Sequence, residues 1–147
     1  MKLERVSEIM TKSVVHTVDM NSSVQEAAAT MKDVGTGCLV VIEKSRLTGI
    51  ITERDIVQRV VAVKKLAREV RVSDVMSKPV LTVGPEALIA DAAKIMMQNK
   101  IRRLVVAEGV RILGIVTVTD FAKMMYKKSA SDPMLAAMAR AAQLMPG

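Results

Sequence analysis

An internal repeat is the feature of this sequence that most restricts the folds open to it. A shift of 65 residues superimposes Thr17–Val57 on Thr82–Ala122 with 14 identities in 41 positions. Ahead of these segments, Val6–Val14 matches Val72–Val80 at five of nine positions, with a shift of 66. Self-similarity at a fixed period is the sequence signature of a duplicated structural unit. We therefore predict two copies of one small domain.

Each copy reads as a strand, a helix, two strands and a second helix. Short runs rich in β-branched residues, bounded by turn formers, predict the strands. Ser23 and Glu26 have capping-box spacing at the start of one helix, and Pro85 is predicted to open its counterpart. The final helices are expected to begin near Asp55 and Asp120. The predicted strands are Val14–Val18, Leu39–Ile42 and Leu47–Thr52 in the first copy, and Val80–Val83, Leu104–Ala107 and Ile112–Thr117 in the second.

The stretch between the copies is charged. Lys64–Glu69 carries four charged residues and reads as a solvated linker. We place a first domain at residues 1–63, a linker at 64–71, a second domain at 72–128 and a tail at 129–147.

The tail lies outside the repeat and is predicted to be helical. Asp132 reads as an N-cap and Pro133 as a first-turn proline. Apolar residues then recur at helical spacing and form a stripe, at Met134, Met138, Ala141 and Met145. Such a stripe most often covers the protein's own core, and a partner subunit is the alternative. Pro146 and Gly147 are expected to end the helix.

Composition excludes several classes of protein. The 147 residues carry a net charge of +7, which favours anionic partners such as phosphate-bearing ligands or nucleic acid. One cysteine and one histidine, Cys38 and His16, supply neither an internal disulfide nor a Cys/His metal site. Phe121 and Tyr126 are too few for recognition by stacked aromatic rings. The lack of an internal disulfide makes a reducing cytoplasm the expected location. No apolar run reaches the roughly 18 residues of a membrane span, so a soluble protein is expected.

Several spaced motifs carry a resemblance to a known family. Gly49–Asp55 and Gly114–Asp120 end the two copies with a Gly-Ile-Ile/Val-Thr-x-x-Asp pattern. Val6–Met10 and Val72–Met76 precede the copies, and Ile101–Leu104 opens a strand of the second. With this order of elements, residues 6 to 126 resemble a tandem pair of cystathionine beta-synthase (CBS) domains.

The resemblance implies a fold and a function. The fold is α/β, in the α+β sense: two β-α-β-β-α CBS domains packed as a pseudo-twofold module, plus the C-terminal helix. In that family, clefts between the paired domains bind adenosyl compounds such as AMP, ADP, ATP or S-adenosylmethionine, usually to regulate an enzyme or a transporter. A stand-alone, energy-sensing regulatory protein is therefore expected.

The residues themselves point to the same ligand class. Thr52 and Thr117 end a predicted strand at a helix start, where free N–H groups and the helix dipole favour phosphate. Three residues on, the carboxylates of Asp55 and Asp120 can accept both hydroxyls of a ribose, as in dinucleotide sites. Thr-x-x-Asp is equally the spacing of a capping box. Spacing alone favours the cap, the resemblance favours a ligand site, and one helix start can serve both.

Further candidates follow from the resemblance. It places a basic residue near ligand phosphate at the strand start that holds Arg102 and Arg103, a task that suits guanidinium geometry. Gly37 and Cys38 stand at the matching positions of the first copy, so the arginines are not duplicated. The remaining expected ligand contacts are Thr17, Arg54, Thr82, Ile101 and Thr119.

No catalysis is expected, because the sequence offers no paired nucleophile and base. No cofactor or metal is expected either, the adenosyl ligand being an effector. Symmetric pairing is the default assembly, so a homodimer is predicted. Two other functions remain open: a ligand-free scaffold for interaction or dimerisation, and a basic nucleic-acid-binding protein.

Overall fold

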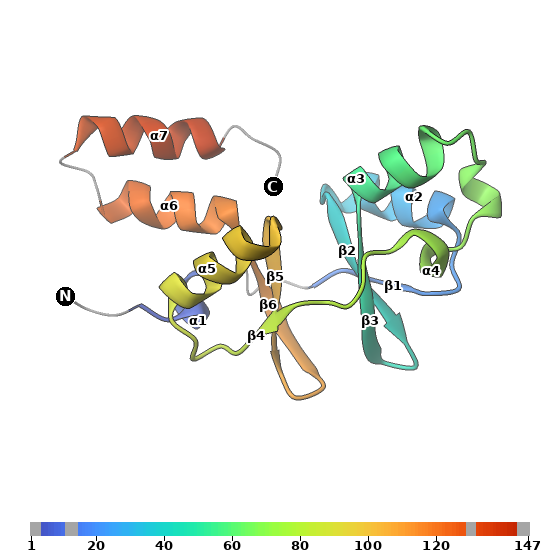
Figure 1. The fold of residues 1–147 in the computed structure, drawn as a ribbon, viewed down its shortest axis with the longest axis horizontal. Helices are drawn as coiled ribbons and strands as arrows, with labels where there is room; N and C mark the ends of the chain where they lie inside the picture. Colours follow the sequence, from blue (N-terminus) through green and yellow to red (C-terminus); the bar gives the residue numbers. More distant parts are fainter. Residues whose placement is uncertain (1–3, 11–14, 129–131, 144–147) are drawn as a thin grey trace. The chain divides into compact units, whose positions relative to one another are not determined.

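The structure is a computed structural model that describes residues 4–10, 15–128 and 132–143. It divides into two compact units, each with one three-stranded sheet (Figure 1). The central unit is Val15–Val80, and the terminal unit joins Met1–Val14 to Leu81–Gly147. The mixed α/β class and the repeated order of elements predicted from the sequence are confirmed.

The central unit is built around the sheet β1-β2-β3. β1 is parallel to β2, because helix α2 connects them, and β2 is antiparallel to β3, because a short turn does. The Ser23 hydroxyl caps α2 by accepting the Glu26 N–H at 3.1 Å, as predicted, and Gly35 ends it in the left-handed conformation. The elements are β1 (Thr17–Asp19), α2 (Val24–Val34), β2 (Cys38–Glu43), β3 (Arg46–Thr52), α3 (Glu53–Ile56), a π-helical turn (Val57–Val61), a 3-10 turn (Ala67–Glu69) and α4 (Val72–Val75).

The terminal unit repeats this plan with the sheet β4-β5-β6. β4 is parallel to β5 and β5 is antiparallel to β6, in a register that matches β2 and β3 residue for residue. The unit consists of α1 (Val6–Ile9), β4 (Thr82–Val83), α5 (Ile89–Asn99), β5 (Arg103–Glu108), β6 (Arg111–Thr117), α6 (Val118–Lys128) and α7 (Pro133–Gln143).

Two local predictions were wrong. Pro85 does not open a helix: α5 begins at Ile89 with Leu88 as its N-cap. The turn that contains Pro85 pairs with α1 instead, since the carbonyl of Pro85 accepts the Ser7 N–H at 3.0 Å. The strand predicted at Val80–Val83 is shorter, since β4 pairs with β5 only at Thr82 and Val83. In the central unit, the strand predicted at Val14–Val18 is β1 (Thr17–Asp19), and Val14 itself lies outside the described residues.

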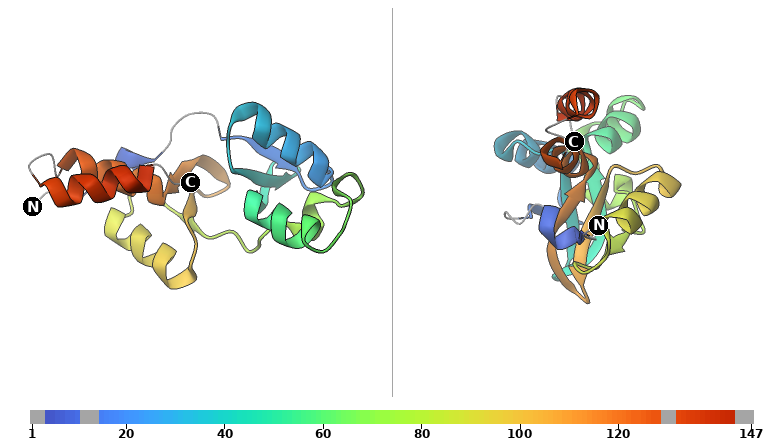
Figure 2. Two further views of the ribbon diagram at one scale, coloured as in Figure 1. Left: turned by 90° about the horizontal axis from the view of Figure 1, so that it is seen from above. Right: turned by 90° about the vertical axis from the view of Figure 1, so that its left-hand side faces the viewer.

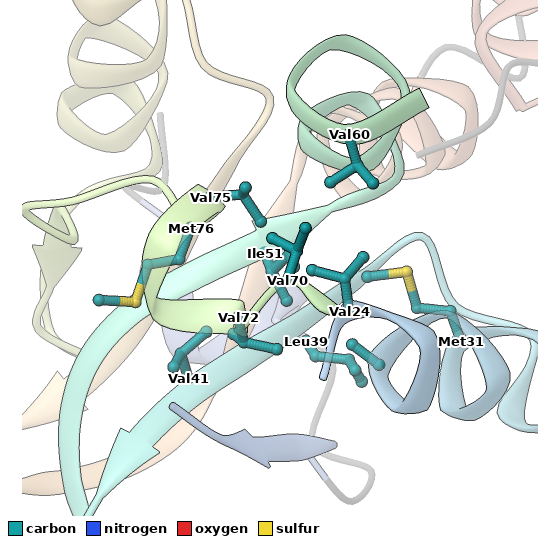
Figure 3. Close-up of a cluster of buried hydrophobic side chains, with 11 residues drawn as sticks. Val24, Met31, Leu39, Val41, Ile51, Val60, Val70, Val72, Val75 and Met76 are labelled. Carbon is teal, nitrogen blue, oxygen red and sulfur yellow. The ribbon is translucent and has the colours of Figure 1, made fainter. Parts of the chain in front are cut away.

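The core of the central unit lies between the sheet and the helices α2 and α4 (Figure 3). Leu39 and Ile51 are fully buried, which stabilises the unit by about 1.5–3 kcal/mol for each side chain. Val72, Val75 and Met76 belong to the same cluster, although they precede the second sequence copy. The helix α4 therefore completes the core of the first copy.

In the terminal unit, the helix that precedes the first sequence copy likewise completes the core of the second copy. Val6 of α1 is fully buried among residues of the second copy, including Leu104 and Val116. Backbone bonds hold α1 there, since the Val6 N–H donates to the Ala87 carbonyl at 2.9 Å. The short helix ahead of each sequence copy thus packs into the other copy's compact unit.

The tail forms the predicted helix α7, which lies beside α6 (Figure 2). Asp132 caps it, because its carboxylate accepts the Met134 N–H at 3.0 Å. Met134 and Met138 are 74% and 59% exposed, so this part of the apolar stripe does not cover the unit's own core. Met145, Pro146 and Gly147 lie outside the described residues. Within the described ranges, every helix is too short or too polar to cross a membrane.

Candidate functional site

Each unit turns from a strand into a helix at the predicted Thr-x-x-Asp motif. Thr52 ends β3 opposite Cys38, and Thr117 ends β6 opposite Arg103. The first helical N–H of each corner donates to the chain just ahead of the neighbouring strand, to Gly37 in one unit and Arg102 in the other, both at 3.0 Å. The two corners therefore share one backbone design and differ in side chains.

The central corner is a complete capping box. The Thr52 N–H donates to Oδ2 of Asp55 at 3.0 Å, and the Asp55 N–H donates to Oγ1 of Thr52 at 3.1 Å. The other carboxylate oxygen, Oδ1, accepts the Ser77 hydroxyl at 3.0 Å and lies 3.7 Å from Nη1 of Arg59. Asp55 is only 6% exposed. Both oxygens of this buried carboxylate are thus engaged within the unit.

Arg59 ties the central corner to α4. Its Nη1 donates to the carbonyls of Val75 and Met76 at 2.8 and 3.1 Å. Those carbonyls end a short helix and have no helical partners, so a cation there is favourable. Asp55, Ser77 and Arg59 form one network that holds the α4 segment against α3.

The terminal corner leaves its carboxylate more open. Oδ2 of Asp120 accepts both the N–H and the hydroxyl of Thr117, at 2.8 and 3.1 Å, and the Asp120 N–H donates to Oγ1 of Thr117 at 3.2 Å. Within the described residues, Oδ1 of Asp120 accepts no hydrogen bond. Met124 stands where the central unit has Arg59, so that cation is missing. Thr11, which matches Ser77, lies outside the described residues.

Burial raises the pKa of Asp120 above the ordinary carboxyl range. The two hydrogen bonds from Thr117 and the charge of Lys123 act in the opposite direction and only reduce the rise. Loss of water thus outweighs the donors that the terminal corner supplies.

Arg103 lies beside this corner with an unsatisfied donor. Its Nε is buried and has no hydrogen-bond partner among the described residues. Arg102 is exposed. The matching positions of the central unit hold Gly37 and Cys38, so the central corner has no such cation.

The other predicted contact residues are not joined to these corners by hydrogen bonds within the described ranges. Thr17 and Thr82 are exposed at the starts of β1 and β4, and Arg54 is exposed on α3. Thr119 is half-buried on α6, and Ile101 packs against the terminal core. Their role in ligand binding stays a prediction.

Sequence reasoning missed Ser77 and Arg59, which complete the central corner. Comparison of the two sequence copies could have indicated Arg59, because this residue lies one helical turn after Asp55 and aligns with the uncharged Met124. The described residues contain no group of three His, Cys, Asp or Glu side chains able to hold a metal ion. Cys38 is buried, as a small core residue would be.

A cavity of about 310 Å³ adjoins the terminal corner, and sequence reasoning missed it as well. It lies within the terminal unit, between α1 and α6. Its lining consists of Glu4, Glu8, Ile9, Asp120, Lys123, Met124, Lys127 and Lys128.

The chain is similar to known proteins along most of its length. A CBS-domain protein from Burkholderia ambifaria has the same fold with a TM-score of 0.78 and 26% identity, covering 88% of this chain and 96% of that one. The hexameric CBS-CP12 protein from bloom-forming cyanobacteria superimposes with a TM-score of 0.75 and 27% identity, covering 98% and 96%.

Sequence relatives agree with the structures. The CBS domain-containing protein YhcV of Bacillus subtilis is 36% identical over 120 residues, which are 82% of this chain and 84% of that protein. Several other relatives are longer, and the chain spans between 32% and 62% of them. The family model of the CBS domain matches residues 6–62 and 72–127. The chain therefore belongs to the family of CBS-domain proteins.

Proposed function

We propose that this chain is a regulatory module that binds an adenine nucleotide or a related adenosyl ligand, with Asp120 as its ribose-binding residue. Pairs of CBS domains generally bind adenosyl ligands in a regulatory role. Stand-alone proteins of the family are regulatory rather than catalytic, so we propose an effector site without catalysis. The candidate ligands are AMP, ADP, ATP and S-adenosylmethionine.

The difference between the two carboxylates carries this proposal. A ribose diol needs carboxylate oxygens that are free to accept its hydroxyls. In the central unit, Ser77 and Arg59 already engage Oδ1 of Asp55, and Thr52 engages Oδ2. Among the described residues of the terminal unit, Thr117 supplies both donors to the Asp120 carboxylate, and both go to Oδ2. Asp120 therefore has the oxygen that a ribose can use.

The helix behind Asp120 also favours an anionic ligand. Asp120 lies in the first turn of α6, which runs for 11 residues. The N-terminus of a helix carries the positive end of its dipole, where phosphate is stabilised. The buried Nε of Arg103 lacks a partner, and a buried donor without one costs about 1–3 kcal/mol. An acceptor atom of the ligand at Arg103 would remove that cost.

Binding would stabilise the terminal unit by mass action, because the ligand would bridge β5, β6 and α6 in the folded chain only. A regulated enzyme or transporter would then sense the ligand through a more rigid terminal unit.

Isothermal titration calorimetry tests the proposal directly. Adenosine, AMP, ADP, ATP and S-adenosylmethionine are titrated into the wild type and into Asp120→Ala. We expect at least one ligand to bind the wild type, and Asp120→Ala to weaken it by about 1.5–3 kcal/mol, the value of hydrogen bonds to a charged group. Asp33→Ala, at an exposed aspartate of α2, is the matched control. Unchanged binding by a folded Asp120→Ala variant would show that Asp120 acts only as a helix cap.

A ligand-free interaction scaffold is the second candidate, and the exposed face of α7 favours it. Met134 and Met138 project from a helix that already packs on α6. CBS-domain proteins oligomerise, and the similar CBS-CP12 protein is hexameric. Failure of all five ligands in the titration, together with stable self-association, would favour the scaffold.

Nucleic-acid binding is the third candidate, supported by the net charge of +7. Binding of that kind weakens steeply as salt rises, because counterions are released from the phosphates. Titration of a DNA fragment at two salt concentrations separates it from a mononucleotide site.

A further inference from the structure

The cavity between α1 and α6 continues from the proposed ribose site. Asp120 is part of its lining, and the cavity then follows α6 past Lys123 to Lys127 and Lys128. Its volume of about 310 Å³ is at the lower end of the range for small-molecule sites. The cavity therefore suits part of a nucleotide rather than a whole one.

Two lysines of the cavity form no close ion pair with the described residues, although the charge of Lys123 acts on Asp120 at longer range. Lys128 forms an ion pair with Glu4 at 2.7 Å. Lys123 and Lys127 have no ion pair within 4 Å among the described residues. They stand four residues apart on α6, so they are neighbours on one helix face. Flexible lysine stems let both ammonium groups reach one anion.

Acidic groups of the lining limit what the lysines attract. Glu4 is matched by Lys128, and Asp120 is the proposed ribose acceptor. Glu8 accepts the Arg5 N–H at 3.3 Å and keeps a charge that opposes an anion. Glu8 is therefore the residue whose neutralisation should strengthen anion binding.

The repeat shows that these lysines belong to the terminal unit alone. The positions that match Lys123 and Lys127 hold Gln58 and Ala62. A structural role common to both corners would not require the lysines, because the central unit forms its corner without them.

We propose that this cavity is an anion subsite that takes the phosphate chain of a nucleoside diphosphate or triphosphate whose ribose binds Asp120. The inference rests on the proposed function and narrows its ligand class: the chain should prefer ADP or ATP over AMP and adenosine. Lys123 and Lys127 bind the phosphates, and the negative charge of Glu8 weakens that binding.

Calorimetry with two double variants tests the subsite. Lys123→Ala/Lys127→Ala is compared with Lys32→Ala/Lys94→Ala, which removes the same charge from exposed positions of α2 and α5. We expect the first to weaken ATP about tenfold or more and to leave adenosine within about twofold. The control should leave both ligands within about twofold. Glu8→Gln should bind ATP more tightly than the wild type does.

Inorganic tripolyphosphate separates failure of the subsite from failure of the proposed function. Equal binding of ATP by the wild type and the Lys123→Ala/Lys127→Ala variant would overturn the subsite and leave the adenosyl site standing. Binding of tripolyphosphate that depends on both lysines, without binding of adenosine or AMP, would support the subsite and reject the adenosyl site. An equal loss of ATP and adenosine in the lysine variant would also overturn the subsite.

Discussion

The Nη1 atom of Arg59 lies 3.7 Å from Oδ1 of Asp55, one helical turn away, and no cation stands at the matching place in the other unit. The same guanidinium donates to the carbonyls of Val75 and Met76. One side chain thus neutralises the buried carboxylate and closes the end of α4. Met124 at the matching position of the second copy can supply neither function.

Arg59→Met should destabilise the central unit by about 1–2 kcal/mol, because two carbonyls lose a charged donor whose side chain is half exposed. Urea unfolding followed by circular dichroism measures the change. Arg54→Met, at an exposed arginine of α3, should stay within about 0.5 kcal/mol of the wild type. Equal stability of the two variants would show that the bonds of Arg59 contribute nothing measurable.

The raised pKa of Asp120 predicts a pH dependence with a definite sign. The folded state holds this proton to a higher pH than the unfolded chain does. The contribution of Asp120 to stability is therefore greatest below the ordinary carboxyl pKa and is lost as the pH rises through the raised folded value.

Asp120→Asn should remove that dependence while still accepting the Thr117 N–H. The free energy of unfolding of the wild type minus that of the variant should fall as the pH rises above about 3.9, the ordinary aspartate pKa. Urea unfolding at closely spaced pH values measures it, with Asp33→Asn as the exposed reference. A difference that rises with pH would contradict the assigned direction.

Much of the fold could be predicted because local patterns and the repeat agree. β-branched runs located the strands, Ser23 located the cap of α2, and Asp132 with Pro133 located the start of α7. The helix start predicted at Pro85 was wrong, because proline in the first turn of a helix is only a tendency. The carbonyls of this turn accept N–H groups of α1 instead. Propensity does not encode such long-range pairing.

The site was harder to predict, because its chemistry depends on contacts between distant segments. The Thr52–Asp55 and Thr117–Asp120 bonds follow from spacing three residues apart. Ser77 lies 22 residues after Asp55 in the chain, and neither local sequence predicts the hydrogen bond between them. The exchange of α1 and α4 between the two sequence copies is hidden for the same reason.

Gly49→Ala should destabilise the central unit by about 1–3 kcal/mol, as overpacking does. A Cβ on Gly49 would lie 2.5 Å from Sδ of Met76 and 3.1 Å from the carbonyl oxygen of Ser77. The Met76 side chain can move, but the Ser77 carbonyl is fixed by the Ile50 N–H at 3.1 Å. Thermal unfolding measures the loss. Gly84→Ala, with no atom within 4 Å of its added Cβ, should be neutral.

The exposed face of α7 predicts self-association. Symmetric dimers are the commonest oligomers, and an exposed methionine stripe is an adaptable apolar contact. Met134→Glu/Met138→Glu should shift the chain toward monomer in light scattering at tens of micromolar, since charge at an apolar contact is costly. Met97→Glu, at a residue of α5 that is 76% exposed, should not change the mass. An oligomer that survives the double substitution would exclude this face as the contact.

Binding should reach one ligand per chain, because of the two corner aspartates only Asp120 has a carboxylate oxygen without a hydrogen bond among the described residues. At about 100 times its dissociation constant, a ligand adds roughly 2.7 kcal/mol of stability, which at this size raises the melting temperature by roughly 5–10 °C. Asp120→Ala should abolish that shift. Asp55→Ala should lower the melting temperature itself, since Ser77 and Arg59 lose their acceptor, and should leave the ligand-induced shift and the calorimetric stoichiometry unchanged. A second binding step in the wild type that disappears in Asp55→Ala would show that a ligand displaces Ser77 and Arg59, and that both corners bind.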